Sequence, residues 1–271
     1  MQQHERGVLW TPVAIVLDHL AGYNGYMDKP WGILEPTAGD REVRDLFDHQ
    51  LFPGSDHIHT KTDPANPEGS YLRATPYGEI FDVLLSTASP DLLTAYPIIL
   101  LGGDLEFDDA FVDALATALR HGRQVLIAPR QREALDKKFE RLKRQGNIQV
   151  LEPWTNPSTQ RAAAISNDRL QVLTRNLPIE VTGDFIQYQI NRTAVGGVIE
   201  LVNNQGVHKK GDQPAVIDPK AKVRVGLKPR VKCSSAREWR SHRVHEKPGV
   251  VFIEVGPGET EFVEFVTERA R

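Results

Sequence analysis

Four polar side chains that follow apolar runs are the first candidates for chemistry in this sequence. Asp18 and His19 end the run TPVAIVLDH; Asp104 ends the run YPIILLGGD, and Glu106 comes two residues later. Because open parallel sheets bind ligands at the carboxyl ends of their strands, we expect these side chains to share one edge of a sheet. Paired carboxylates there have the chemistry of the general acid and base that glycoside hydrolysis uses.

A structural interpretation of the same residues is simpler. Asp18 and His19 are suited to capping the loop that follows them, through hydrogen bonds to the backbone. Asp104 and Glu106 belong to an acidic cluster that opens a helical pattern, where negative charge stabilises the helix by about 0.3–1 kcal/mol per group. We therefore expect no catalytic residue, and keep these four as the candidates if the chain is an enzyme.

The segment SDHIHTKTD has residue types that bind metals. His57 and His59 lie on the same side of the chain if the segment is extended, and Asp63 follows with a carboxylate. Zinc accepts such ligands. A solvated loop explains the pattern more simply, because the segment lies within a long polar stretch, Pro53 to Gly78. We expect no bound metal and no cofactor.

Aromatic residues gather in the stretches between the predicted strands. Sugars present apolar C–H faces that stack on such rings, so these residues are candidates for binding carbohydrate. The same residue types are enriched at subunit and domain interfaces, which is the alternative. The aromatic candidates are Tyr23, Tyr26, Trp31, Tyr71 and Tyr77.

The elements that must position these side chains alternate between strand and helix in the first part of the chain. Apolar runs tipped by Asp, Gly or Pro and separated by helical patterns are typical of an open parallel sheet. The predicted strands are Thr11–His19, Tyr96–Asp104, Arg123–Pro129 and Ile148–Leu151, with a strand-like element at Glu79–Ala88. The predicted helices are Arg41–Leu51, Ser89–Ala95, Phe107–His121 and Gln131–Arg144.

The pattern changes after a Pro-, Asn- and Ser-rich stretch at Pro153 to Arg161. From about Gly183 the apolar residues alternate with polar ones in short runs that are separated by turn residues, which is typical of an antiparallel β-sandwich. We therefore predict an α/β domain over residues 1–165 and a β-sandwich domain over residues 166–271.

Composition narrows the possible partners. The formal net charge of the 271 residues is −3, so no basic balance indicates nucleic acid. No apolar run reaches the roughly 20 residues of a membrane span, and MQQHERGVLW lacks the apolar stretch of a signal peptide. The compartment stays open between the cytoplasm and, if the chain is part of a longer precursor, the periplasm or the exterior. The single cysteine, Cys233, can form no disulfide within the chain.

Several runs resemble a class I glutamine-amidotransferase-like domain, namely TPVAIVLDH, TPYGEIFDVLL and LLTAYPIILLGGDLEFDDAFVDALATALRHGRQVLIAP. They look like the version that follows the catalytic barrel in multidomain glycoside hydrolases, such as the trimerisation domain of family 42 β-galactosidases. NRTAVGGVIELVNNQG and GPGETEFVEF resemble the terminal β-sandwich of the same proteins. The resemblance covers most of the chain and implies a flavodoxin-like parallel sheet with helices on both faces.

The resemblance implies an ancillary role rather than catalysis. Class I amidotransferases use a cysteine at a tight strand-to-helix turn, and the corresponding turn here, Leu101 to Glu106, has none. We expect a non-catalytic oligomerisation module that partners a glycoside hydrolase catalytic domain or carbohydrate and forms a homo-oligomer. One alternative is a hydrolase acting on glycosides or uronic-acid polysaccharides through Asp18, His19, Asp104 and Glu106. The other is a carbohydrate-binding module.

Overall fold

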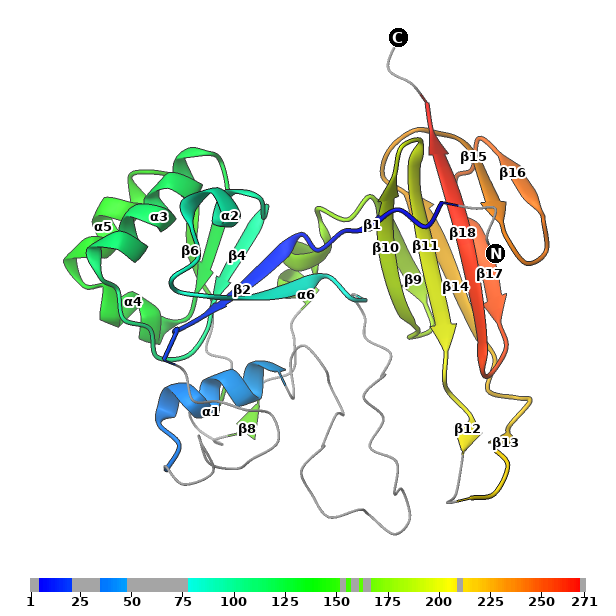
Figure 1. The fold of residues 1–271 in the computed structure, drawn as a ribbon, viewed down its shortest axis with the longest axis horizontal. Helices are drawn as coiled ribbons and strands as arrows, with labels where there is room; N and C mark the ends of the chain where they lie inside the picture. The colour runs from blue at the N-terminus through cyan, green and yellow to red at the C-terminus, as the bar shows by residue number, and fades with distance from the viewer. Residues whose placement is uncertain are drawn as a thin grey trace. The chain divides into compact units, whose positions relative to one another are not determined.

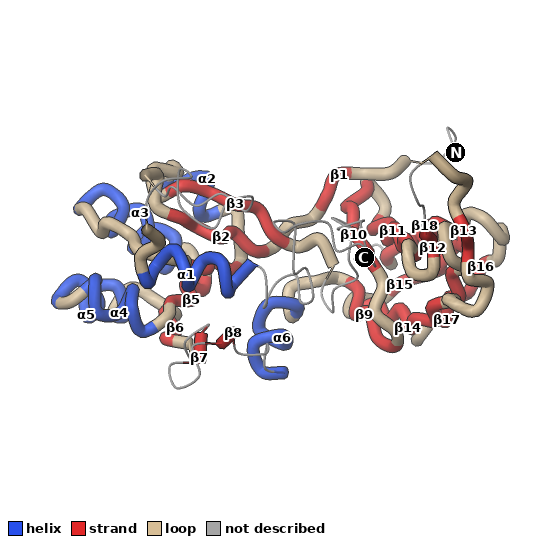
Figure 2. Tube along the Cα trace, turned by 90° about the horizontal axis from the view of Figure 1, so that it is seen from below, coloured by secondary structure: helices blue, strands red, loops and turns tan. Residues whose placement is uncertain are grey.

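The fold was analysed in a computed structural model, which describes residues 5–20, 35–47, 78–151, 155–156, 161–162, 167–208 and 212–268. These residues group into two compact units. One unit contains a parallel sheet with helices beside it, and the other is built largely of antiparallel strands (Figures 1 and 2). In the described part of the chain, no helix has the length and apolar character that crossing a bilayer requires.

The parallel sheet has five strands, and their apolar side chains explain why it is buried. Each neighbouring pair is parallel, and the spatial order is β3-β2-β4-β5-β6, which is 2-1-3-4-5 in the order of the chain. The central strands are buried throughout or nearly so, as expected for a sheet covered on both faces. The predicted parallel sheet is confirmed. Its strands are β2 (Val13–Leu17), β3 (Phe81–Leu85), β4 (Ile98–Leu101), β5 (Gln124–Ile127) and β6 (Ile148–Val150).

Helix α3 (Asp109–Arg120) forms the largest part of the core on one face of this sheet. Asp108 caps its N-terminus by accepting a hydrogen bond from the Phe111 amide at 2.7 Å. Its apolar face buries Phe111, Leu115 and Leu119 against the sheet, with residues of neighbouring helices. Helix α2 (Pro90–Thr94) packs on α3 and begins at the predicted place, with Ser89 as its cap and Pro90 at its first position.

Helix α1 (Ala38–Asp45) begins three residues before the predicted start. Thr37 and Asp40 form a capping box, in which each side chain accepts a hydrogen bond from the other residue's amide. The predicted apolar face of this helix is confirmed for Val43 and Leu46, which are buried. The predicted end at Leu51 lies outside the described residues.

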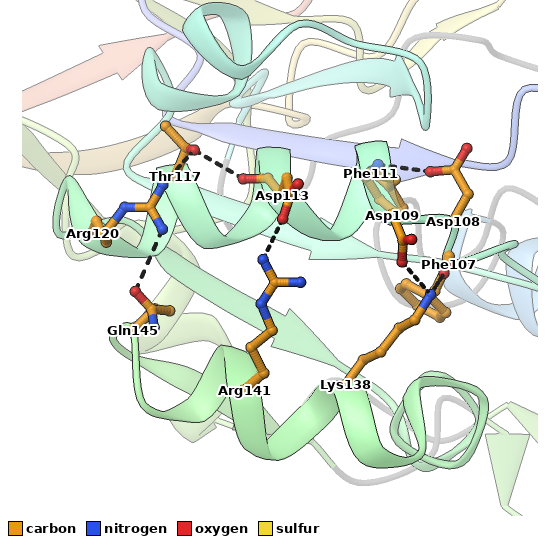
Figure 3. A network of polar contacts seen from close by, with 10 residues as sticks. All are labelled: Phe107, Asp108, Asp109, Phe111, Asp113, Thr117, Arg120, Lys138, Arg141 and Gln145. Carbon is orange, nitrogen blue, oxygen red and sulfur yellow. Dashed lines mark hydrogen bonds and ion pairs between the residues drawn. The ribbon is translucent and has the colours of Figure 1, made fainter.

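The prediction of one helix over Gln131–Arg144 is wrong. The structure has two helices, α4 (Pro129–Leu135) and α5 (Lys137–Lys143), separated at Asp136, whose φ of +46° leaves the right-handed helical region. Contacts between α5 and α3 accompany the break (Figure 3). Lys138 lies 3.1 Å from the Asp109 carboxylate, and Arg141 pairs with Asp113. Local sequence does not encode these contacts.

The second unit contains two main antiparallel sheets. One has the order β1-β10-β11-β18-β15-β16 and the other has the order β17-β14-β9. Alternating burial, as in β17 with its pattern of buried and exposed residues, confirms the predicted antiparallel strands. Their bounds are β1 (Val8–Leu9), β9 (Ile179–Gly183), β10 (Gln187–Thr193), β11 (Gly196–Asn203), β14 (Val223–Pro229), β15 (Cys233–Glu238), β16 (Val244–Glu246), β17 (Val251–Val255) and β18 (Glu259–Thr267).

The short elements complete the description. Strands β12 (Val207–His208) and β13 (Val216–Ile217) pair with each other, as do β7 (Thr155–Asn156) and β8 (Arg161–Ala162). Helix α6 (Asn167–Thr174) precedes β9. Strand β1 pairs antiparallel with β10, so Val8 and Leu9 belong to the antiparallel unit, although they lie within the predicted α/β range of 1–165.

A buried asparagine joins the two main antiparallel sheets. Asn203 ends β11 in the larger sheet, and its Nδ2 donates to the carbonyl of Val255 in β17 at 3.0 Å and to that of Ala221 at 2.8 Å. Its Oδ1 accepts from the Gln205 amide at 3.0 Å. The side chain is 1% exposed, and without it the Val255 carbonyl would lose a buried hydrogen bond while Ala221 and Gln205 would lose partly buried ones.

We expect Asn203→Ala to lower the free energy of unfolding by roughly 2–3 kcal/mol, because it leaves buried backbone groups without partners. Urea denaturation followed by tryptophan fluorescence measures the loss. The exposed neighbour Asn204 supplies the matched control, since Asn204→Ala removes the same group from a solvated position. Equal stability of the two variants would show that Asn203 does not hold the sheets together.

Candidate functional site

Asp18 lies at the carboxyl end of β2 and is 9% exposed. Its Oδ1 accepts from the Leu20 amide at 2.8 Å, and its Oδ2 accepts from the Glu106 amide at 3.0 Å. One carboxylate therefore fixes the turn after β2 and ties it to the segment that follows β4. The structure brings Asp18 and Glu106 together as predicted, but it does so through the backbone of Glu106.

His19 links the end of β2 to the residue that follows the neighbouring strand β3. Its amide donates to Ser86 Oγ at 3.0 Å, and its Nδ1 lies 3.1 Å from the same oxygen. The Ser86 amide in turn donates to the carbonyl of Leu17 at 2.8 Å. Serine, histidine and aspartate thus meet, because Asp18 Oδ1 is 3.7 Å from the same Nδ1. A catalytic relay needs the serine and the acid at opposite ring nitrogens, so this arrangement is a structural latch.

A pocket of about 390 Å³ opens beside these residues, between the end of β3 and the first turns of α2 and α3. His19 and Glu106 from the sequence-predicted set line it. Open α/β sheets bind ligands where the strand order reverses, which here is between β2 and β4. The pocket is therefore the candidate site. Its lining residues are His19, Ser86, Thr87, Ala88, Ser89, Pro90, Glu106, Asp108, Ala110, Phe111 and Ala114.

Asp104 does not line this pocket and has partners of its own. Its Oδ2 accepts from Thr37 Oγ1 at 2.7 Å, and its Oδ1 accepts from Arg130 at 3.0 Å. The carboxylate thus ties the start of α1 to the start of α4. Sequence reasoning grouped Asp104 with Asp18 because both follow buried strands, and β2 and β4 are indeed neighbours, but the Asp104 side chain bonds to Thr37 and Arg130 instead of facing the pocket.

Gly103, in the turn after β4, has little space for a side chain. It adopts φ +74°, and a Cβ at this position would lie 2.6 Å from Val43 Cγ2. A nucleophile at position 103 would therefore require Val43 on α1 to move. Cys233 is buried in β15 of the other unit, and burial raises the pKa of its thiol, which leaves it protonated and unreactive.

Sequence reasoning missed Glu42, a buried acid on α1. Burial raises its pKa from 4.5 to about 7, and the nearby guanidinium of Arg130, whose Nε lies 3.4 Å from Glu42 Oε2, offsets part of the rise. A buried carboxyl with a perturbed pKa beside an arginine is a functional-site candidate. The signal was present in the helix pattern, because position 42 lies four residues before Leu46 on the buried face.

The remaining candidates lie outside the described residues. This holds for the aromatic residues Tyr23, Tyr26, Trp31, Tyr71 and Tyr77, and for the metal-ligand types His57, His59 and Asp63. Their proposed roles in binding carbohydrate or metal stay predictions.

Comparison with known proteins gives likeness in fold only. No family model matches the chain, and no curated protein matches its sequence. The α-L-fucosidase isoenzyme 2 from Paenibacillus thiaminolyticus matches with a TM-score of 0.50 and 11% identity, over 97% of this chain and 49% of that one. At this identity the match shows a shared fold and nothing about activity.

Two further structures match with lower TM-scores. A rhamnosidase from Novosphingobium sp. PP1Y has a TM-score of 0.42 and 15% identity over 75% of this chain and 21% of its own. A catalytic mutant of a GH42 β-galactosidase from G. stearothermophilus has a TM-score of 0.45 and 8% identity over 95% of this chain and 40% of its own. These structural neighbours are carbohydrate-active enzymes, and this chain spans half of their length or less.

We expect Asp18→Asn to lower the free energy of unfolding by about 1–3 kcal/mol. The amide that replaces the carboxylate presents a donor to one of the two backbone amides, so at least one hydrogen bond is lost. Urea denaturation measures the change. Asp91→Asn, at an exposed position on α2, is the matched control and should change stability by less than about 0.5 kcal/mol.

Glu42 should make stability fall as pH rises. Its folded-state pKa of about 7 lies above the ordinary 4.5, so its contribution is fully present below pH 4.5 and is lost as pH rises through about 7. Glu42→Gln stays uncharged. As pH rises from 4.5 to above 7, the parent chain therefore loses this contribution and the variant does not. The free energy of unfolding of Glu42→Gln should accordingly rise by roughly 2–3 kcal/mol relative to that of the parent chain.

The measurement is denaturant unfolding of both proteins across this pH range. Glu133→Gln, at an exposed position on α4, is the control and should give a constant difference from the parent. A constant difference for Glu42→Gln as well would mean that the Glu42 carboxyl titrates normally.

Proposed function

We propose that this chain is a non-catalytic ancillary module of a glycoside hydrolase, which supports the assembly of the enzyme. The observation that carries the proposal is the structural hydrogen bonding of the two acids that follow buried strands, Asp18 and Asp104. Both oxygens of Asp18 and both oxygens of Asp104 accept hydrogen bonds that hold the fold together. A carboxylate that must release such bonds to move a proton is poorly suited to general acid–base catalysis.

The strand order supports a more specific origin. The order 2-1-3-4-5 is that of flavodoxin-like sheets. The resemblance to class I amidotransferase-like domains implies a sheet of the same kind. At the turn where such a domain would carry its nucleophile, Gly103 has a left-handed backbone conformation and little space for a side chain. These features favour a scaffold of the amidotransferase type without its chemistry, as in the trimerisation domains of family 42 β-galactosidases.

The fold likeness supports association with a carbohydrate-active enzyme. The fucosidase structure includes both units of this fold within about half of its length. In the proposed arrangement, the catalytic acids belong to another domain or chain, and this module contributes contacts to it. Carbohydrate or a glycoside hydrolase catalytic domain is then the partner, as the sequence led us to expect.

An exposed apolar strand supports self-association. β3 is at the edge of the parallel sheet, and Val83 and Leu85 on one of its faces are 52% and 49% exposed. Edge strands with exposed aliphatic side chains offer both hydrogen-bonding groups and apolar area to a second chain. We propose that this edge contributes to a homo-oligomeric contact.

The purified chain should self-associate and should not turn over glycosides. Sizing by light scattering across a range of concentrations tests the first expectation, and screening aryl glycosides, including α-L-fucosides and β-galactosides, tests the second. We expect the double change Val83→Lys and Leu85→Lys to shift the protein toward monomer. Val250→Lys, at an exposed position of the antiparallel unit, is the control.

Two results would contradict the proposal. Turnover that disappears in Asp104→Asn or Glu106→Gln would identify a hydrolase instead. A parent chain that stays monomeric at every concentration would remove the oligomerisation role.

A further inference from the structure

We propose that the pocket at the carboxyl ends of β2 and β3 binds an uncharged, hydroxyl-bearing ring compound, such as one pyranose unit. Its volume of about 390 Å³ lies at the lower end of the range for small-molecule sites, which is about 300–1,000 Å³. A single sugar ring fits that size better than an extended chain does. The inference goes beyond the ancillary role, because a module can bind such a ligand with or without supporting assembly.

The apolar part of the pocket is made by small side chains. Ala110 and Ala114 lie one turn apart on α3, and the pocket is also lined by Ala88, which precedes α2, and by Pro90, its first residue. Phe111 adds an aromatic side chain. The C–H face of a pyranose is apolar and suits such a surface, while the short alanine side chains leave the space that the ring needs.

The hydrogen-bonding groups that line the rim of the pocket include the carboxylate of Glu106. No described residue forms a hydrogen bond or ion pair with the side chain of Glu106, in contrast to Asp18 and Asp104. Asp108 uses Oδ1 to cap α3, and no described residue bonds to its second oxygen. Carboxylate oxygens only accept hydrogen bonds, so they select ligands that bring hydroxyl donors.

The latch between His19 and Ser86 leaves one imidazole nitrogen to a ligand. Nδ1 lies 3.1 Å from Ser86 Oγ, so this nitrogen is engaged in either tautomer. The neutral imidazole then presents Nε2 as a donor or as an acceptor. The rim therefore combines acceptors from Glu106 and Asp108 with a histidine nitrogen, and a hydroxyl group can pair with either kind.

The charge of the rim decides the class of ligand. Two carboxylates line the pocket, and none of its described lining residues is lysine or arginine. A uronate or a sulfated sugar would place a negative charge beside Glu106 and Asp108, which costs binding energy because like charges repel in a partly desolvated site. The pocket thus favours neutral sugars over acidic ones.

The test is ligand-observed saturation-transfer NMR, with titration calorimetry for any ligand that gives a signal. The probes are the methyl glycosides of galactose, glucose, fucose and rhamnose, together with methyl glucuronide. We expect at least one neutral methyl glycoside to bind and to bind more tightly than the glucuronide. Glu106→Gln should weaken that binding by about tenfold, because it removes a charge-assisted hydrogen bond.

Filling the pocket gives a second, independent variant. Ala110 is exposed on α3, so Ala110→Leu occupies the pocket without disturbing the core, and it should abolish binding. Ala134→Leu and Glu133→Gln, at exposed positions of α4 outside the pocket, are the matched controls and should bind like the parent.

The outcomes separate this inference from the proposed function. Absence of binding by all neutral glycosides, tighter binding of the glucuronide, or unchanged binding by Ala110→Leu would each overturn the pocket assignment. Turnover of a bound glycoside would support the pocket but contradict the non-catalytic role. Binding without turnover, lost in Ala110→Leu, supports both.

Discussion

The parallel unit depends on one buried carboxylate at the point where its sheet would bind a ligand. Asp18 accepts the amides of Leu20 and Glu106, and so holds the end of β2 against the segment that leaves β4. The two strands diverge into different connections at this point, and the backbone amides there have no strand partner. A charged acceptor satisfies them at once, which a neutral side chain does less well. Asp18 therefore stabilises the fold instead of performing the acid–base chemistry that its place in the sequence suggests.

The same structural use of carboxylates explains why acids gather at this edge without forming an acid–base pair. Asp104 ties α1 to α4, Asp108 caps α3, and Glu42 stays buried beside Arg130. Each helix that begins at the sheet edge presents free amides, and each nearby acid is drawn to one of them or to the arginine. Glu106 is different, because within the described residues its backbone amide, and not its carboxylate, is bonded to the scaffold.

Elements with strong local signals could be predicted from the sequence, and those that depend on distant contacts could not. The buried strands, the cap of α2 at Ser89 and the extent of α3 follow from apolar runs and capping residues. The break at Asp136 comes where α5 begins its contacts with the distant helix α3, whereas the early start of α1 follows from a local signal, the capping box of Thr37 and Asp40, which the apolar spacing does not reveal. For the site, the sequence identified the edge and His19 and Glu106, but it did not pair His19 with Ser86, which is 67 residues away.

The pairing of β1 with β10 has a consequence for how the protein is made. Val8 and Leu9 are synthesised before the parallel unit, but their partners Arg192 and Asn191 follow only after that unit has been produced. The first strand must therefore wait as an unpaired segment while the intervening residues fold, and closing that long loop costs entropy that local contacts do not repay. Completion of the antiparallel unit is consequently a late event on the ribosome, and the parallel unit is set to act as an insertion that folds first.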